Sequence, residues 1–283
     1  MKISLVTDST SDIPEGLRLQ HCIEVIPAIL NLGSESYEDG KGLSREEFYE
    51  RLPKLSNPPT TSAPSVGSFL ERYERLFNAG TSHILSFHPP ERLSGIYNAA
   101  RLAAEQFGER VRVIDSGQLT LGLGFQVLAA AEAIASGALL DDILGLVESV
   151  KQRVRVVALL DTIHYLRRSG RVSWAKAMVG ELLNIKPLVE LRFGIIERLD
   201  QVRTRSQGIL RLTESLNSWG PLERLAILHT NAEAAARQLL EDLRPRLPIQ
   251  PLVVNVTTII GTHTGPNGLG LAAVPSLDRT LDE

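Results

Sequence analysis

Four hydroxyl-rich segments each follow an apolar run of strand length. They are residues 7–12 (TDSTSD), 58–64 (PPTTSAP), 93–97 (LSGIY) and 260–270 (IGTHTGPNGLG). In an α/β fold the carboxyl ends of the strands converge on one crevice, which is where ligands bind. These segments would line the crevice with hydrogen-bond donors, which an anion needs when it leaves water. Because the chain has no P-loop, G-x-G-x-x-G motif or cysteine cluster, we expect a small oxyanion such as a carboxylate, bound without metal, cofactor or nucleotide.

Ser94 precedes a predicted helix and can act in two ways. Serine is a common helix cap, which would make its role structural. A helix N-terminus also presents free N–H groups to an anion, and Gly95 would let a ligand approach the backbone. Opposing groups could come from Thr60, Thr61 and Ser62, because neighbouring prolines stiffen their segment and reduce the entropy lost on binding. Ordinary turn roles account for these hydroxyl residues as well.

His263 lies in a glycine-rich stretch rather than on an apolar helical face. It can donate to a carboxylate or act in acid–base chemistry, or it can be a loop residue with an ordinary hydrogen bond. Asp8 and Asp12 follow the first strand, where an aspartate can be a nucleophile or a Mg²⁺ ligand, but helix capping and Asx turns explain them equally well. An enzyme, a hydrolase or phosphotransferase using Asp8 or His263, therefore remains the alternative to a binding protein.

The composition narrows the class of protein. The 30 basic and 33 acidic side chains nearly balance, so a DNA-binding regulator is disfavoured and no nucleic-acid partner is expected. Cys22 is the single cysteine, which is typical of a reducing compartment. The apolar stretch at the N-terminus is too short for a signal peptide. The alanine-rich stretch 119–135 is interrupted by glycines and polar residues, so we expect a cytoplasmic protein without an integral membrane segment.

Apolar runs of strand length alternate with stretches of helical period, which indicates an α/β fold with a mostly parallel sheet covered by helices. A fresh strand after residue 153 predicts two lobes, 1–153 and 154–283, that share an extensive interface. The predicted strands are 3–6, 23–32, 83–87, 111–115, 154–160, 185–193, 195–202, 224–229 and 252–260. The predicted helices are 45–51, 66–78, 94–107, 120–136, 140–151, 163–168, 174–183, 206–219 and 232–243. A hairpin should turn at Gly194, and Ser44, Ser65 and Ser173 should cap the helices that follow them.

Taken in order, the motifs resemble those of the DegV family of fatty-acid-binding proteins, which includes the lipid-carrying subunit of bacterial fatty acid kinase. The resemblance runs nearly from end to end. It rests on TDSTSD (7–12), PPTTSAPS (58–65), LSGIYNAA (93–100), VIDS (113–116), LDTIHYLRRSGRVSWAKAMVGELLNIKPL (160–188), VRTRS (202–206) and IGTHTGPNGLGL (260–271). Each motif alone is weak, but all of them in this order and spacing are highly specific.

The resemblance implies a two-lobe α/β protein, with a mostly parallel sheet in the N-terminal lobe and a mixed α/β C-terminal lobe. One long-chain fatty acid, such as palmitate, would lie between the lobes with its tail in an apolar tunnel. By their positions in the motifs, Thr61, Ser94 and His263 would hold the carboxylate. Secondary candidates for this site are Ser62, Gly95 and Thr60.

The resemblance further implies a non-catalytic role in lipid transport and fatty acid metabolism. The protein would present its fatty acid to a separate ATP-dependent kinase subunit, and transient membrane contact is compatible with that role. Arg171, Arg203 and Arg205 resemble the family's basic face, which would dock the kinase or a phosphate-bearing partner; solvation of the surface is the alternative explanation.

Three positions depart from the family pattern. Ala63 stands where the family commonly has Gln, Ile96 replaces the usual Thr of an S-G-T-Y motif, and the segment 88–92 (HPPER) is unusual. Ile96 removes a hydroxyl near the expected head group, so we expect it to alter the depth or shape of the tail tunnel. Thr61, Ser94 and His263 are retained, so fatty acid binding is still expected.

Overall fold

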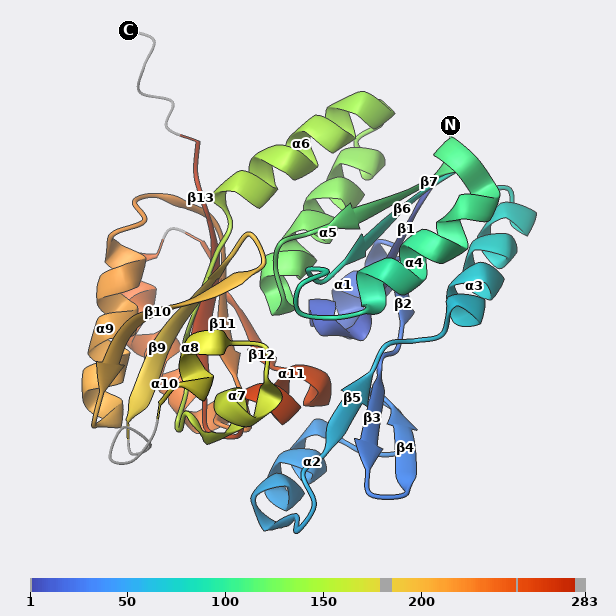
Figure 1. The fold of residues 1–283 in the computed structure, drawn as a ribbon. Coiled ribbons are helices and arrows are strands. Elements are labelled where there is room, and N and C mark those ends of the chain that lie inside the picture. Colours follow the sequence, from blue (N-terminus) through green and yellow to red (C-terminus); the bar gives the residue numbers. More distant parts are fainter. Residues whose placement is uncertain (1, 179–184, 248, 278–283) are drawn as a thin grey trace, which may run out of the picture.

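The computed structural model describes residues 2–178, 185–247 and 249–277, which form three sheets with their covering helices (Figure 1). In the N-terminal half, a parallel sheet has the strand order β2 (Glu24–Ile26), β1 (Ile3–Asp8), β6 (His83–His88) and β7 (Val111–Asp115). Successive strand residues point to opposite faces, and both faces are buried here. This explains why these strands read as continuous apolar runs.

Helices cover the two faces of the parallel sheet. Val6 and Ile84 belong to one apolar cluster with α3 (Val66–Asn78) and α4 (Ile96–Ala104). Leu5 and Leu85 belong to another with α5 (Thr120–Ala135) and α6 (Leu140–Arg153). The carboxyl ends of β1 and β6 therefore lie at the same edge of the sheet, between the two helix layers. Two of the hydroxyl-rich segments, 7–12 and 93–97, lie at or after these strand ends.

A small antiparallel sheet lies beside α2 (Arg45–Arg51), with the strand order β4 (Glu35–Glu38), β3 (Ile29–Leu32) and β5 (Thr60–Ser62) (Figure 1). The prediction of a single strand over 23–32 is wrong. The structure has two strands there, β2 and β3, which belong to different sheets and are separated at Pro27. Proline has no N–H to continue a ladder. Part of the predicted loop 58–64 is the strand β5, which places Thr61 opposite Leu30.

The C-terminal half contains a six-stranded mixed sheet in the order β10, β9, β8, β13, β11, β12, in which β11 and β12 form the parallel pair. These strands are β8 (Arg155–Leu159), β9 (Lys186–Arg192), β10 (Ile195–Val202), β11 (Leu222–His229), β12 (Leu252–Asn255) and β13 (Leu269–Pro275). The predicted hairpin is confirmed, with Gly194 at φ +76° between β9 and β10. Helices α9 (Arg205–Asn217) and α10 (Glu233–Leu243) pack against this sheet.

Helix α5 joins the two halves. Its residues share one apolar cluster with Leu5 of the parallel sheet and with Val156 and Ala272 of the mixed sheet. A helix that is apolar on all sides is expected to be buried, and the glycines of α5 let Val156 of the mixed sheet and the backbone of Ser11, just after β1, approach it closely. The boundary between residues 153 and 154 stays a prediction. Among the described helices, none is long and apolar enough to cross a lipid bilayer.

The remaining helices are α1 (Glu15–Gln20), α7 (His164–Ser169), α8 (Ser173–Lys176), α11 (Thr258–Thr264), η1 (Ser9–Ser11), η2 (Leu52–Lys54), η3 (Glu105–Arg110) and η5 (Arg244–Arg246). Ser44 and Ser65 cap α2 and α3 as predicted, each accepting an N–H from the first turn. The predicted cap at Ser173 is wrong, because Val172 occupies the cap position of α8 and its side chain makes no capping bond. The predicted helix 174–183 is also too long at residues 177 and 178, which are not helical, and its residues 179–183 lie outside the described residues.

Two further predicted elements differ from the structure. The predicted helix 94–107 begins later, at Ile96, and after Ala104 it tightens into the 3-10 turn η3. The predicted strand 252–260 is wrong in its second half, because β12 ends at Asn255 and α11 begins at Thr258. The hydroxyl of Thr257 accepts the N–H of Ile259 and so caps α11. A run of β-branched residues favours a strand, but this cap and the contacts of α11 with the N-terminal half override that preference.

Candidate functional site

A cavity lies where the carboxyl ends of β1 and β6 meet elements of the C-terminal half. It encloses about 1,090 Å³, counting the space at its mouth. Its walls come from η1, β5, the segment between β6 and α4, and the helices α7 and α11. Among the described residues, no group of three or more His, Cys, Asp or Glu is arranged to hold a metal ion.

The three predicted head-group residues line this one cavity, although they come from three separate elements. Thr61 lies on β5, Ser94 lies just before α4 and His263 lies in the last turn of α11. The Thr61 hydroxyl oxygen is 3.0 Å from Nε2 of His263. Ser94 Oγ accepts the N–H of Ile96, the first residue of α4, at 3.3 Å. The same serine also lines the cavity.

Burial sets the charge of His263. Loss of solvent, together with the positive charges of Arg171 and Arg168, lowers the pKa of this imidazole from 6.5 to about 4. At neutral pH the ring is therefore uncharged, with one nitrogen donating and the other accepting. If Nε2 carries the proton, it donates to the Thr61 hydroxyl oxygen, and the Thr61 O–H is then available to a ligand.

The sequence prediction that His263 lies in a loop is wrong, because residues 258–264 are helical. The neighbouring glycines serve packing rather than loop flexibility. A Cβ on Gly261 would lie 2.2 Å from the Tyr49 hydroxyl, and a Cβ on Gly265 would lie 2.3 Å from Cδ2 of Tyr165. Gly265 also adopts φ +81° and ends the helix. Close approach of these two tyrosines therefore explains the glycines at positions 261 and 265.

The secondary candidates have different positions. Ser62 and Gly95 line the cavity, whereas Thr60 is exposed and lies outside the described lining. Ser62 Oγ also accepts a hydrogen bond from Asn31 at 3.0 Å.

The three predicted basic residues are not equivalent. Arg171 lines the cavity and is exposed at its mouth. Arg205 donates to the backbone oxygen of Asn267 at 2.5 Å and lies 4.0 Å from the Asp161 carboxylate. Arg203 is exposed, and neither Arg203 nor Arg205 is in the described lining of the cavity.

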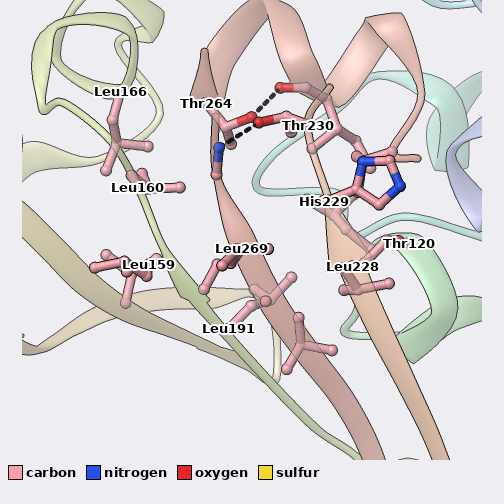
Figure 2. Close-up of a pocket in the computed structure, with 18 of the residues that line it drawn as sticks. Thr120, Leu159, Leu160, Leu166, Leu191, Leu228, His229, Thr230, Thr264 and Leu269 are labelled. Atoms are coloured by element: carbon pink, nitrogen blue, oxygen red, sulfur yellow. Dashed lines mark hydrogen bonds between the residues drawn. The ribbon is translucent and has the colours of Figure 1, made fainter. Parts of the chain in front are cut away.

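A second, apolar cavity of about 680 Å³ adjoins the first. Leucines from several strands and α7 surround it, including Leu159, Leu160, Leu166, Leu191, Leu228 and Leu269 (Figure 2). Two of its threonine hydroxyls bond to the backbone: Thr264 donates to the oxygen of Ile260, and Thr230 accepts the N–H of Gly268 (Figure 2). The residues that line both cavities are Leu119, Leu166, Ile196, Ile260 and Thr264.

Sequence reasoning missed a buried chain of hydrogen bonds below the first cavity. Ser86 Oγ lies 2.7 Å from Nε2 of His88, and Nδ1 of His88 lies 2.8 Å from the Asp8 carboxylate. Tyr73 OH is 2.8 Å from Ser86 Oγ, and the Thr10 hydroxyl donates to Asp8 at 2.6 Å. The available signal was the spacing of Ser86 and His88, since residues two apart on a strand share a face.

The Ser86–His88–Asp8 order is that of a hydrolase triad, but its surroundings differ. All three residues are fully buried, with an exposed fraction of 0%. None of the three lines either cavity. A nucleophile must reach the atom that it attacks, and Ser86 faces neither cavity. These hydrogen bonds instead hold β6 against β1.

Comparison with known proteins gives one consistent result. The family model for uncharacterised proteins of the DegV family matches residues 2–276. A DegV domain-containing protein of Streptomyces coelicolor is 37% identical over 273 residues, covering 95% of this chain and 97% of that protein. The structure is also similar to two solved structures that are described as fatty-acid-binding DegV proteins. The one from Thermus thermophilus has a TM-score of 0.89 at 32% identity, and the one from Bacillus subtilis has a TM-score of 0.88 at 33% identity; each comparison covers 98% of this chain and 100% of the other. The chain therefore belongs to the DegV family.

Proposed function

We propose that the protein binds one long-chain fatty acid. The observation that carries this proposal is the junction of a polar cavity, with Thr61, Ser94 and His263, and an apolar cavity walled by leucines. Each CH₂ of the tail contributes about 0.8 kcal/mol when it is buried, so the apolar cavity supplies most of the affinity. The descriptions of the Thermus thermophilus and Bacillus subtilis proteins as fatty-acid-binding support the same ligand.

The polar end offers the donors that a carboxylate requires. Ser94 Oγ accepts the Ile96 N–H, which leaves its own O–H to donate. Thr61 can donate as well when Nε2 of His263 carries the proton and donates to the threonine oxygen. A bound carboxylate therefore favours that tautomer of His263. These hydrogen bonds offset the loss of water around the anion, while Ser62 and Gly95 lie close enough to shape the same end of the cavity.

We extend the proposal to the setting in which the ligand is used. The protein carries fatty acid in the cytoplasm, with the ligand between the lobes 1–153 and 154–283, and presents it to an ATP-dependent kinase subunit or exchanges it with a membrane surface. Arg171 at the mouth of the cavity supports docking of an anionic partner or phosphate group. Arg203 and Arg205 extend this basic face.

The protein itself acts without catalysis in this proposal. A histidine whose pKa is about 4 is a weak base at neutral pH, and the triad-like Ser86–His88–Asp8 chain has no access to either cavity. The purified protein should therefore not hydrolyse palmitoyl esters or acyl phosphates. Hydrolysis that disappears in His263→Ala, or in Ser86→Ala, would replace this proposal with an enzymatic one.

The ligand is tested by organic extraction of the purified protein followed by mass spectrometry. We expect about one long-chain fatty acid per chain. A matched sample of Leu228→Arg, which places a charge in the apolar cavity, should contain much less lipid because a buried charge without a partner is costly. Recovery of a nucleotide or a sugar phosphate in place of a fatty acid would refute the proposed ligand.

A further inference from the structure

Helix α11 carries His263 at one end, and side chains of the N-terminal half hold its other end. The Asp39 carboxylate accepts hydrogen bonds from the hydroxyls of both Thr257 and Thr258, the latter at 2.7 Å. The Asp12 carboxylate accepts the backbone N–H of Thr257 at 2.9 Å. Two carboxylates from one half of the molecule thus fix the first turn of a helix from the other half.

Helix α2 strengthens the same junction. Arg45 pairs with Asp12 at 2.8 Å and also donates to the backbone oxygen of Asn255. The Tyr49 hydroxyl donates to the oxygen of Val256 at 2.9 Å. Its ring occupies the space that a side chain at Gly261 would need, so α11 lies directly against α2.

The junction is buried, which makes its geometry specific. The exposed fractions are 9% for Asp39, 0% for Thr257 and 2% for Thr258. A buried carboxylate that loses a partner has a high free-energy cost, and connected buried hydrogen bonds favour a single arrangement. Helix α11 has only 7 residues, a length that is not stable alone in water. Its position therefore depends on tertiary contacts.

We propose that Asp39, acting through Thr257 and Thr258, is a positioning residue for the head-group site. It sets the place of α11 and thereby the contact between His263 and Thr61, which lie 3.0 Å apart on α11 and β5. Asp39 touches no ligand atom in this role. The inference rests on the proposed function for its effect on binding, whereas its effect on the His263–Thr61 contact follows from the geometry alone.

The test uses Thr258→Val, which removes one hydroxyl bond to Asp39 at nearly constant shape. Two quantities are measured: the imidazole resonances of His263 in ligand-free protein, assigned with His263→Gln, and the Kd for palmitate. We expect the His263 resonances and their pH titration to shift and the Kd to rise about tenfold, since tenfold corresponds to the loss of one buried hydrogen bond. Asp39→Asn keeps an acceptor oxygen and should lie between wild type and Asp39→Ala in both measurements.

The matched control is Thr7→Val. Thr7 is also fully buried, and its hydroxyl donates to the oxygen of Phe87 at 2.9 Å, within the parallel sheet and away from α11. This variant should lose stability while His263 and the palmitate Kd stay unchanged. Equal effects of Thr7→Val and Thr258→Val would overturn the positioning role, as would unchanged His263 resonances in folded Thr258→Val and Asp39→Asn. Should wild type fail to bind palmitate, the proposed ligand is refuted, and the His263 resonances still decide the positioning role.

Discussion

At the residue scale, the contact between Thr61 and His263 depends on two groups that are 202 positions apart in the sequence. Each alone is a weak hydrogen-bonding group. If the uncharged imidazole donates through Nε2, the threonine O–H is free to point into the cavity. Burial keeps the ring uncharged at neutral pH, so in the proposed function the carboxylate would be held by hydrogen bonds from neutral groups, and Arg171 lies at the mouth of the cavity.

Thr61→Val tests the role of this hydroxyl at nearly constant shape. We expect palmitate affinity to fall by roughly 1–3 kcal/mol, the cost of leaving a buried polar partner unsatisfied. The control is Thr60→Val, the same change at the exposed neighbouring position of β5, which should bind as wild type. Isothermal titration with palmitate measures both variants. Equal affinities for the two variants would remove Thr61 from the site.

The stability of the protein should depend on pH through His263. The pKa of this residue is 6.5 in its ordinary state and about 4 in the folded protein, so the unfolded chain binds the proton first as the pH falls. Stability is therefore retained above about pH 6.5 and lost toward pH 4, by roughly 3 kcal/mol in full. Asp12 acts in the opposite direction, because burial raises its pKa from 3.8 to about 6 and the folded state then binds the proton first.

Comparing the free energy of unfolding of wild type with that of His263→Gln separates the pH effect of the histidine from that of Asp12. Both proteins keep Asp12, so the gap between their free energies of unfolding reports His263 alone. We expect wild type to lose roughly 3 kcal/mol relative to His263→Gln between pH 7 and pH 4. Urea unfolding at a series of pH values measures this gap. A gap that stays constant over this range would contradict a depressed pKa at His263.

At the element scale, helix α5 is the part of the chain on which both large sheets pack. Its glycines are sites of close approach rather than of flexibility. A Cβ on Gly122 would lie 2.5 Å from Cγ2 of Val156 in the mixed sheet, and a Cβ on Gly124 would lie 2.7 Å from the backbone oxygen of Ser11 beside β1. The spacing of the two halves, and with it the width of the cavities, therefore depends on these two positions.

Gly124→Ala should destabilise the protein even though alanine is the better helix former. The clash involves a backbone oxygen, and overpacking of this kind costs roughly 1–3 kcal/mol. Gly145 in α6 provides the control, because nothing lies within 4 Å of a Cβ built there. Gly145→Ala should stabilise by about 0.5–1 kcal/mol through helix propensity. Chemical denaturation of the two variants should thus give changes of opposite sign, and changes of equal sign would argue against tight packing at Gly124.

At the scale of the whole molecule, the two adjoining cavities are lined by residues of both halves, so a bound acyl chain would contact both at once. A ligand that binds only the folded state stabilises it by RT ln(1 + [L]/Kd), about 2.7 kcal/mol at one hundred times Kd. Removal of lipid should accordingly lower the midpoint of thermal unfolding, and palmitate should restore it.

Hexadecanol is the matched ligand for this measurement, since it has the same chain length without the carboxylate. We expect palmitate to raise the unfolding midpoint more than hexadecanol does. Only palmitate has a charged carboxylate to accept the hydrogen bonds proposed for Thr61, Ser94 and His263, and hydrogen bonds to a charged acceptor are stronger. Equal shifts would show that the polar cavity contributes nothing to recognition. No shift with either ligand would contradict a tail site between the two halves.

Much of the local structure could be predicted from the sequence, because its causes are local. Ser44 and Ser65 cap α2 and α3 as predicted from their position before an apolar period. Gly194 turns the predicted hairpin, because glycine adopts the positive φ required there. The order of strands and helices also predicted a mostly parallel sheet covered by helices. The resemblance of the motifs to the DegV family selected Thr61, Ser94 and His263, and the structure brings these three residues to one cavity.

Tertiary structure decided the rest. The segment after β12 has the composition of a strand, yet Thr257 and Asp39 make it the helix α11, and these residues are far apart in sequence. The bond from His88 to Asp8 depends on the pairing of β6 with β1, which no local pattern specifies. Leucines that line the apolar cavity and leucines that fill the core follow the same periodicity, because both lie on buried faces. Which of them border empty space is set by how the sheets and α5 pack in three dimensions.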